Sequence, residues 1–302
     1  MTALRQAQGR PERSRGAGTG SQEPGTLRVR WFLALTLAVV GAHLGAPAAI
    51  AQTPRLSNGR IETHATTNVA RDVPALAATL GEPMWIGYAQ PMIDGNHEMC
   101  DYWNDGRMIT QSTDPIRLEP PDFFFVMFRV EEKQITRIRT YSANCPLDAG
   151  GKPVHWFTNV PVSDSVAYMK TFMSPNATKK LNDSAVTVIA LTKGDQPLNE
   201  LLTLARDGST SAIKGNALFW LAQRAGAKAV GTITTAIEND PDTEVKKKAV
   251  FALSQLPKDE GVPLLIQQAR TNKNPAVRKQ AMFWLGQSKD PRALRFFEEI
   301  LR

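Results

Sequence analysis

The chain has 302 residues, of which 42% are hydrophobic and 22% charged. This composition is typical of a folded protein rather than a disordered one, and the length allows about two domains. The formal net charge is +7, but six arginines and only two glutamates lie in residues 1–51, so that +3 remains in the rest of the chain. So small and evenly spread a charge excludes an electrostatic argument for nucleic-acid binding.

Residues 1–26 are polar, rich in glycine and without hydrophobic periodicity. The stretch LRQAQGRPERSRG within them resembles a translated intergenic repeat of bacterial genomes. We therefore expect residues 1–26 to be a non-native or disordered leader.

Residues 27–51 are typical of a secretory signal peptide. Two arginines precede an apolar run at 31–40, and the segment ends in the small-residue triplet Ala49-Ile50-Ala51. The alternative is a transmembrane anchor, which needs ~20 apolar residues. His43 and Pro47 interrupt the apolar stretch and favour cleavage after the triplet. The sequence thus predicts an exported protein, periplasmic or secreted, that is not inserted in a membrane after cleavage.

Cys100 and Cys145 are the two cysteines of the chain. In an exported protein an even pair predicts one disulfide. The alternatives are two free buried thiols or a metal-binding pair, and a titration of free thiols in the native protein distinguishes them.

Residues 52–160 are predicted to form a β-rich α+β domain. A helix is expected at 69–80, starting only at Val73 because Pro74 disfavours an earlier start. Five strands of a largely antiparallel β-meander follow from about 85 to 141, since Asp-Gly pairs between apolar runs indicate hairpins. The triple phenylalanine at 123–125 points to both faces of its strand, so we expect this sheet to be covered on both sides.

His97, Glu98 and Cys100 lie together in the sequence, but a zinc motif of the His-Glu-x-x-His type would need a second histidine at position 101, which is aspartate. His155 is interpreted as a histidine at the edge of the core. The sequence therefore predicts no catalytic, cofactor-binding or metal-binding residue. An unidentified activity in the β-rich domain, around His97 and Cys100, remains as an alternative.

Residues 161–302 are predicted to form an α-solenoid with a period of 32 residues. Three columns share this spacing: Ala217, Ala249 and Ala281; Phe219, Phe251 and Phe283; and Leu221, Leu253 and Leu285. Each period holds two apolar-periodic stretches of helical length, which predicts stacked helix pairs. Asp195, Asp259 and Asp290 are placed where they would cap the second helices.

The motif Asn239-Asp240-Pro241-Asp242-Thr243-Glu244-Val245-Lys246, with Ala249 and Leu253, resembles HEAT repeats of the phycobilisome-lyase-like, or short HEAT, class. Asn274-Pro275-Ala276-Val277-Arg278, with Ala281, Leu285 and Gly286, repeats it. The resemblance covers about 180–302, and the whole layout looks like secreted bacterial HEAT-repeat proteins of unassigned function. Lys214 and Lys246 stand where the family usually has arginine, which puts its ladder of charges in doubt here.

The column 220, 252 and 284 reads Trp, Ala, Trp. A small residue between two large ones lets stacked layers interdigitate, so the repeated Phe-Trp-Leu phrase is interpreted as a packing unit rather than a ligand cradle.

The resulting hypothesis is a non-enzymatic, exported scaffold or adaptor that binds a protein or peptide of the cell envelope, without a cofactor and without nucleic acid. Second helices of such arrays line a concave binding surface. Seven polar positions on them form the predicted face: Glu200, Thr203, Thr232, Thr235, Gln267, Arg295 and Glu298. The alternative implied by the resemblance is a lyase or chaperone-like enzyme acting on a tetrapyrrole-bearing protein.

Overall fold

The structure is a computed structural model that describes residues 53–66, 68–79, 81–95, 97, 99–100, 103–104, 107–108 and 121–302. The predicted leader and signal peptide, and Glu98 of the predicted His-Glu-Cys cluster, lie outside these residues. Within the described ranges, no helix is both long and apolar enough to cross a membrane.

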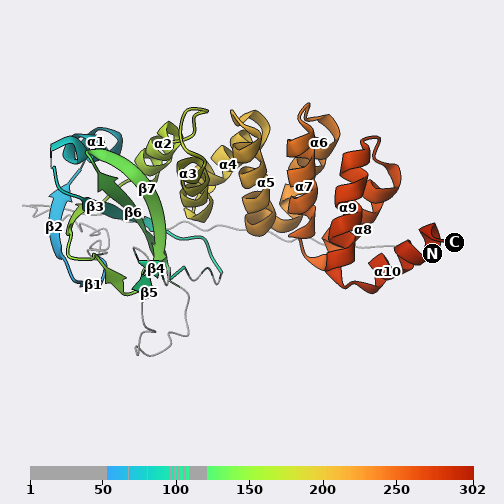
Figure 1. The fold of residues 1–302 in the computed structure, drawn as a ribbon, viewed down its shortest axis with the longest axis horizontal. Helices are drawn as coiled ribbons and strands as arrows, with labels where there is room; N and C mark the ends of the chain where they lie inside the picture. Colours follow the sequence, from blue (N-terminus) through green and yellow to red (C-terminus); the bar gives the residue numbers. More distant parts are fainter. Residues whose placement is uncertain are drawn as a thin grey trace, which may run out of the picture. The chain divides into compact units, whose positions relative to one another are not determined.

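The N-terminal half is built on one five-stranded mixed sheet (Figure 1). Its strands, in spatial order, are β2 (Arg60–Ala65), β9 (Pro153–Thr158), β3 (Met84–Pro91), β6 (Phe123–Glu131) and β7 (Gln134–Ser142). The pairs β3–β6 and β6–β7 are antiparallel, whereas β2–β9 and β9–β3 are parallel. Two short pairs lie apart from it: β1 (Leu56–Ser57) with β8 (Leu147–Asp148), and β4 (Trp103–Asn104) with β5 (Arg107–Met108).

The predicted β-rich half followed by an α-solenoid is confirmed, but the sheet is only partly the predicted antiparallel meander. Three predicted strands are present in the meander β3–β6–β7. The segments expected as the second and third strands contribute, among described residues, only the separate hairpin β4–β5. β3 pairs directly with β6, and the other side of β3 is occupied by β9 and then β2, which join the sheet in parallel from opposite ends of the domain. Such pairing between distant segments leaves no hairpin signal in the sequence.

The sheet is covered on both faces, as the triple phenylalanine predicts. Phe124 is fully buried in the large core cluster shared with the helices, while Phe125, its neighbour, is 1% exposed in a second cluster on the other face. Cys145 belongs to this second cluster and forms a disulfide with Cys100. The predicted pairing of the two cysteines is therefore present, and a disulfide is typical of an oxidising compartment.

Helix α1 (Val69–Thr79) begins four residues earlier than expected. Asn68 starts it by accepting the backbone N–H of Arg71 at 3.1 Å, and Pro74 lies on the exposed side of the second turn. The cap outweighs the single hydrogen bond that proline cannot donate.

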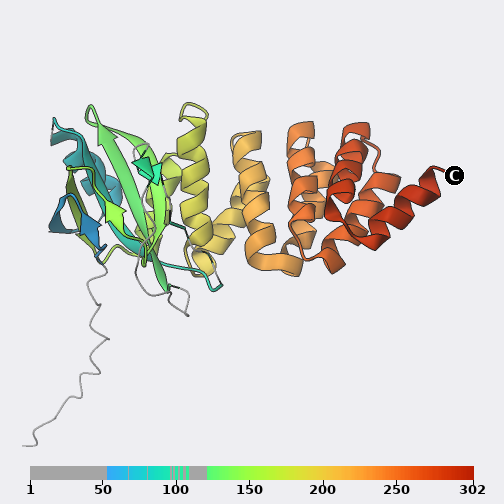
Figure 2. The ribbon, with the colours of Figure 1, turned by 60° about the horizontal axis from the view of Figure 1, so that its bottom comes forward.

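The C-terminal half is a row of helix pairs that follows α2 (Val162–Thr171). Its first helices, α3, α5, α7 and α9, stand side by side in Figure 1 and Figure 2, and each is followed by a second helix. The pairs are α3 (Lys179–Leu191) with α4 (Asp195–Asp207), α5 (Ser211–Ala225) with α6 (Val230–Asn239), α7 (Thr243–Ser254) with α8 (Lys258–Thr271), and α9 (Pro275–Ser288) with α10 (Pro291–Ile300). A short 3-10 helix (Gly226–Ala229) links α5 to α6.

The 32-residue period of the sequence is the distance between successive layers. The alanine column is fully buried at each of the three positions named above, and the leucine column is at most 1% exposed. The caps of the first helices follow the same period, because the side chains of Thr178, Thr210, Asp242 and Asn274 each accept a backbone N–H of the first turn.

The caps of the second helices agree with the prediction only in part. Asp290 caps α10 as expected. Asp195 and Asp259 lie inside the first turns of α4 and α8, behind the cap positions Gly194 and Pro257. Acidic side chains in a first turn stabilise the helix through its dipole rather than by capping.

Basic residues at the same position of α5, α7 and α9 form hydrogen bonds and ion pairs with the turns between layers. Lys214 contacts Asp240 at 2.8 Å, and Lys246 donates to the carbonyl oxygens of Ile237 and Glu238 at 2.9 and 2.6 Å. Arg278 makes the equivalent bonds to Asn272 and Lys273. Lys246 thus makes the contacts that Arg278 makes one layer later, whereas Lys214 forms an ion pair with Asp240 instead.

One hydrophobic core cluster runs from Val69 in α1, through the sheet, to Phe296 in α10. Helix α3 packs on β7, and α2 lies between α1 and the array. The predicted domain boundary at residue 160 falls between β9 and α2, inside this continuous core, and stays a prediction.

Candidate functional site

Five aromatic rings form a continuous strip across the first helices, which we call the aromatic ribbon. Its members, in order of contact, are Trp220, Phe219, Phe251, Trp284 and Phe283. Neighbouring ring centres are 4.8–5.7 Å apart, and the rings of Phe219 and Phe251 are nearly parallel at 3°. The 32-residue repeat produces this contact, because it places a phenylalanine at the same point of each layer.

The ribbon has a buried side and an exposed side. Trp220 and Trp284 pack against the core, and Trp284 also lines a cavity of about 200 Å³ between α7, α8 and α9. Phe219 and Phe251 are half-buried, and Phe283 is 53% exposed. A glutamine column lies beside the phenylalanines, four residues further along each helix, with Gln223 donating to Gln255 at 3.3 Å. An apolar strip with a polar margin is the arrangement found at protein interfaces.

The seven residues predicted as a concave binding face lie on the second helices, as expected, but not all are accessible. Five are exposed: Thr203, Thr235, Gln267, Arg295 and Glu298. Thr232 is half-buried, and the Glu200 side chain, 15% exposed, accepts a charged hydrogen bond from Lys170 of α2 at 2.9 Å. This ion pair joins α2 to the first layer, so Glu200 already has a structural partner.

The predicted alternative around His97 and Cys100 has no reactive thiol. Cys100 is bonded to Cys145, and both cysteines of the chain are thereby used. His97 is half-buried and its Nε2 lies 3.3 Å from the Asp94 carbonyl oxygen.

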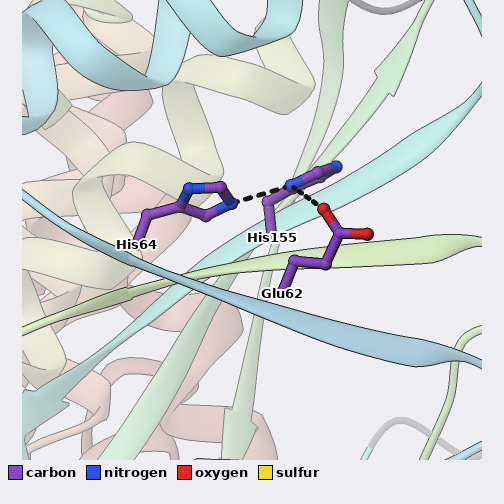
Figure 3. Close-up of side chains that lie close together, drawn as sticks. All are labelled: Glu62, His64 and His155. Carbon is purple, nitrogen blue, oxygen red and sulfur yellow. Dashed lines mark hydrogen bonds and ion pairs between the residues drawn. The ribbon is translucent and has the colours of Figure 1, made fainter.

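A cluster that was not predicted from the sequence lies at the edge of the sheet where β2 pairs in parallel with β9. Glu62 and His64 belong to β2, and His155 to β9 (Figure 3). His64 Nε2 is 2.9 Å from His155 Nδ1, and Glu62 Oε2 is 3.7 Å from the same nitrogen. One ligand atom from each of the three side chains fits within a distance of 4.8 Å.

The strand register explains why these side chains meet. Glu62 is paired with His155, and His64 is paired with Phe157, two residues further along both strands. Alternate residues of a strand share one face, so all three functional side chains point to the same side of the sheet. The His64 ring also contacts the Phe157 ring, with centres 5.6 Å apart.

Burial differs sharply across the cluster. The side chain of His155 is 5% exposed and that of Glu62 is 39% exposed, while His64 is half-buried. Burial lowers the pKa of His155, the Glu62 carboxylate opposes this change and His64 reinforces it. A lowered pKa favours the neutral imidazole, the form that donates a lone pair to a metal ion.

The burial of His155 agrees with its interpretation as a histidine at the edge of the core. The sequence alone does not reveal the cluster, because β2 and β9 are not among the predicted strands. The one signal present is Glu62 and His64 at a spacing of two, which places both on one face only once the segment is known to be extended.

A family model for HEAT repeats matches residues 231–302. Among solved structures, the CpcE–CpcF complex of phycocyanin lyase from Nostoc is similar at 16% identity, covering 47% of this chain and 90% of that chain with a TM-score of 0.36. Human deoxyhypusine hydroxylase in complex with glycerol matches at 14% identity, over 41% of this chain and 43% of that one, with a TM-score of 0.33.

The Escherichia coli protein YibA matches at 23% identity over 46% of this chain and 54% of its own, with a TM-score of 0.33. No curated protein matches the chain. The matched residues extend from α6 to the end of α10. The C-terminal half is thus a helical repeat scaffold, and its residues 231–302 are similar to HEAT repeats.

Proposed function

We propose that the protein is an exported, non-enzymatic adaptor whose helical array binds a protein or peptide of the cell envelope. The observation that carries this proposal is the aromatic ribbon. It extends over three layers and ends in Phe283, a large side chain left 53% exposed. Aromatic side chains contribute much of the binding energy at protein interfaces, and exposed apolar strips bounded by polar residues mark such surfaces.

Export is supported by two independent features. The signal-like segment 27–51 precedes the described residues, and the disulfide between Cys100 and Cys145 favours an oxidising compartment. Within the cell envelope a partner for the ribbon would be another exported protein. The exposed second-helix residues, Thr235 among them, offer the alternative contact face of the same array.

The test is a mild cross-linking pull-down from the native host with tagged residues 52–302 as bait. A bait that ends near residue 180 is an unsuitable control, because it would expose the core that α3 covers on β7. Single exposed substitutions are cleaner. Phe283→Glu places a charge on the ribbon, Thr235→Glu places one on the second-helix face, and Leu294→Glu, at a residue 61% exposed on α10, is the matched control.

The expected result is one stoichiometric envelope protein that Phe283→Glu loses and the other two variants retain. Loss with Thr235→Glu alone would move the contact to the second helices while preserving the adaptor role. Failure of the unsubstituted bait to capture any protein would contradict the proposal. Circular dichroism of each bait confirms that the substitutions leave the helices folded.

A further inference from the structure

We propose that Glu62, His64 and His155 form a binding site for a divalent transition-metal ion, with zinc as the first candidate. Two imidazole nitrogens and one carboxylate oxygen converge from adjacent strands, as Figure 3 shows. Imidazole and carboxylate together suit zinc and neighbouring first-row metals, whereas calcium and magnesium prefer oxygen ligands alone. This site lies outside the helical array and is independent of the adaptor role.

The distances fit a coordination shell. Ligand atoms bound about 2.0–2.2 Å from a tetrahedral zinc ion stand roughly 3.3 Å from one another. The two short distances here, 2.9 Å between the histidine nitrogens and 3.7 Å from Glu62 to His155, lie on either side of that value. The third pair, His64 with Glu62, lies within 4.8 Å. Rotation of the Glu62 side chain, which is 39% exposed, would bring the three atoms around one ion.

The placement of protons within the cluster also favours a bound ion. A hydrogen bond between His64 Nε2 and His155 Nδ1 uses one proton and satisfies only that pair. The facing oxygen of Glu62, at 3.7 Å from His155 Nδ1, lies beyond hydrogen-bond distance. A divalent cation would accept lone pairs from all three atoms. It would require only that each neutral imidazole carry its proton on the other ring nitrogen, with no net loss of protons.

Burial of the His155 imidazole at this position of the sheet costs free energy. Its Nε2 is buried and has no hydrogen-bond partner within the described ranges of the chain. An apolar residue at this position of β9 would avoid the cost of an unsatisfied buried nitrogen. The metal-binding role supplies the compensating gain, because it uses the opposite nitrogen, Nδ1, which faces the cluster.

The remaining geometry leaves the ion an entry path. β2 is the edge strand of the sheet, and the Glu62 carboxylate is 39% exposed. Its other oxygen accepts a charged hydrogen bond from Arg60 at 2.6 Å, which orients the carboxylate as outer residues orient ligands in known sites. Three protein ligands leave further coordination positions for water, as in zinc sites that are open to solvent.

The test measures zinc and cobalt binding to tag-free protein stripped with a chelator, since a histidine tag would itself bind both ions. Isothermal titration with Zn²⁺ should give one ion per chain. Co²⁺ should produce visible absorption bands that zinc displaces. Nitrogen-15 spectra of the histidine rings should show the change at Nδ1 of His155 and Nε2 of His64, which identifies the ligand atoms without relying on any activity.

The variants His64→Gln and Glu62→Gln, both on the accessible strand, should each weaken zinc binding at least about tenfold. His97→Gln, at a half-buried histidine outside the cluster, should bind zinc as the unsubstituted protein does. The proposal is overturned if the unsubstituted protein binds no stoichiometric zinc, or if the two cluster variants bind as well as it does. It is equally overturned if His97→Gln loses binding to the same extent. A thermal melt of each metal-free variant separates lost binding from lost folding.

Discussion

Ala252 is fully buried in the middle layer, at the position where the layers before and after it carry Trp220 and Trp284. Its methyl group belongs to the hydrophobic core cluster, so a larger side chain at this position would have to displace neighbouring core atoms. A single small residue thus fixes how closely α7 approaches its neighbours.

We expect Ala252→Trp to lower the free energy of unfolding by about 1–3 kcal/mol, because an overpacked core forces neighbouring side chains and backbone to shift. Urea denaturation followed by circular dichroism measures the change. Thr235→Trp, on the exposed side of α6, adds the same ring where there is space and should leave the stability nearly unchanged. Equal stability of Ala252→Trp and the unsubstituted protein would show that this position is not packed as described.

At the scale of elements, the start of α10 combines a cap with a charge. Asp290 accepts the backbone N–H of Arg292 at 2.9 Å and two hydrogen bonds from the Arg292 guanidinium at 2.9 and 2.8 Å. These bonds hold the pKa of Asp290 well below its usual range, the Arg292 side chain contributing most.

A lowered pKa in the folded state means that the ionised carboxylate stabilises the fold above the unfolded pKa of about 4 and that this stabilisation is lost as the pH falls further. An asparagine at this position would keep the cap but not the charge, so Asp290→Asn should be less stable than the unsubstituted protein at neutral pH. The difference should shrink as the pH is lowered from about 5 to 2. Melting temperatures of both proteins across this range test it, and a difference that does not vary with pH would refute the electrostatic contribution.

The helical elements are predictable because their information is local. Each layer repeats the same caps and the same alanine and leucine columns every 32 residues, so the helix pairs support one another's assignment. The sheet is harder, since β2 and β9 pair in parallel between segments far apart in the sequence, with Glu62 opposite His155. The candidate metal cluster depends on that pairing, so it is invisible until the register is known, whereas the disulfide needs only the count of cysteines.

At the scale of the whole molecule, the sheet and the array share one hydrophobic core. Val186 and Ile189 of α3 are fully buried, and this helix packs on β7. An interface of this kind couples the folding of the parts it joins, because neither can open without exposing the apolar surface of the other.

We therefore expect peptides from β6 and from α3 to lose protection against hydrogen exchange at the same urea concentration. Mass spectrometry of exchange at increasing urea makes the measurement, and peptides from α10, at the far end of the array, serve as the internal comparison because terminal layers open more easily. Separate transitions for β6 and α3 would instead establish two independent domains with a boundary near residue 160.

The alternation of large and small residues has a consequence for how such a chain can change its length. Excision of residues 243–274, one full period, would leave Asp242 to cap α9 and would preserve the spacing of the alanine and leucine columns. It would also bring Trp284 into the layer next to Trp220, where Ala252 had separated them. The layers therefore have an order and are not interchangeable.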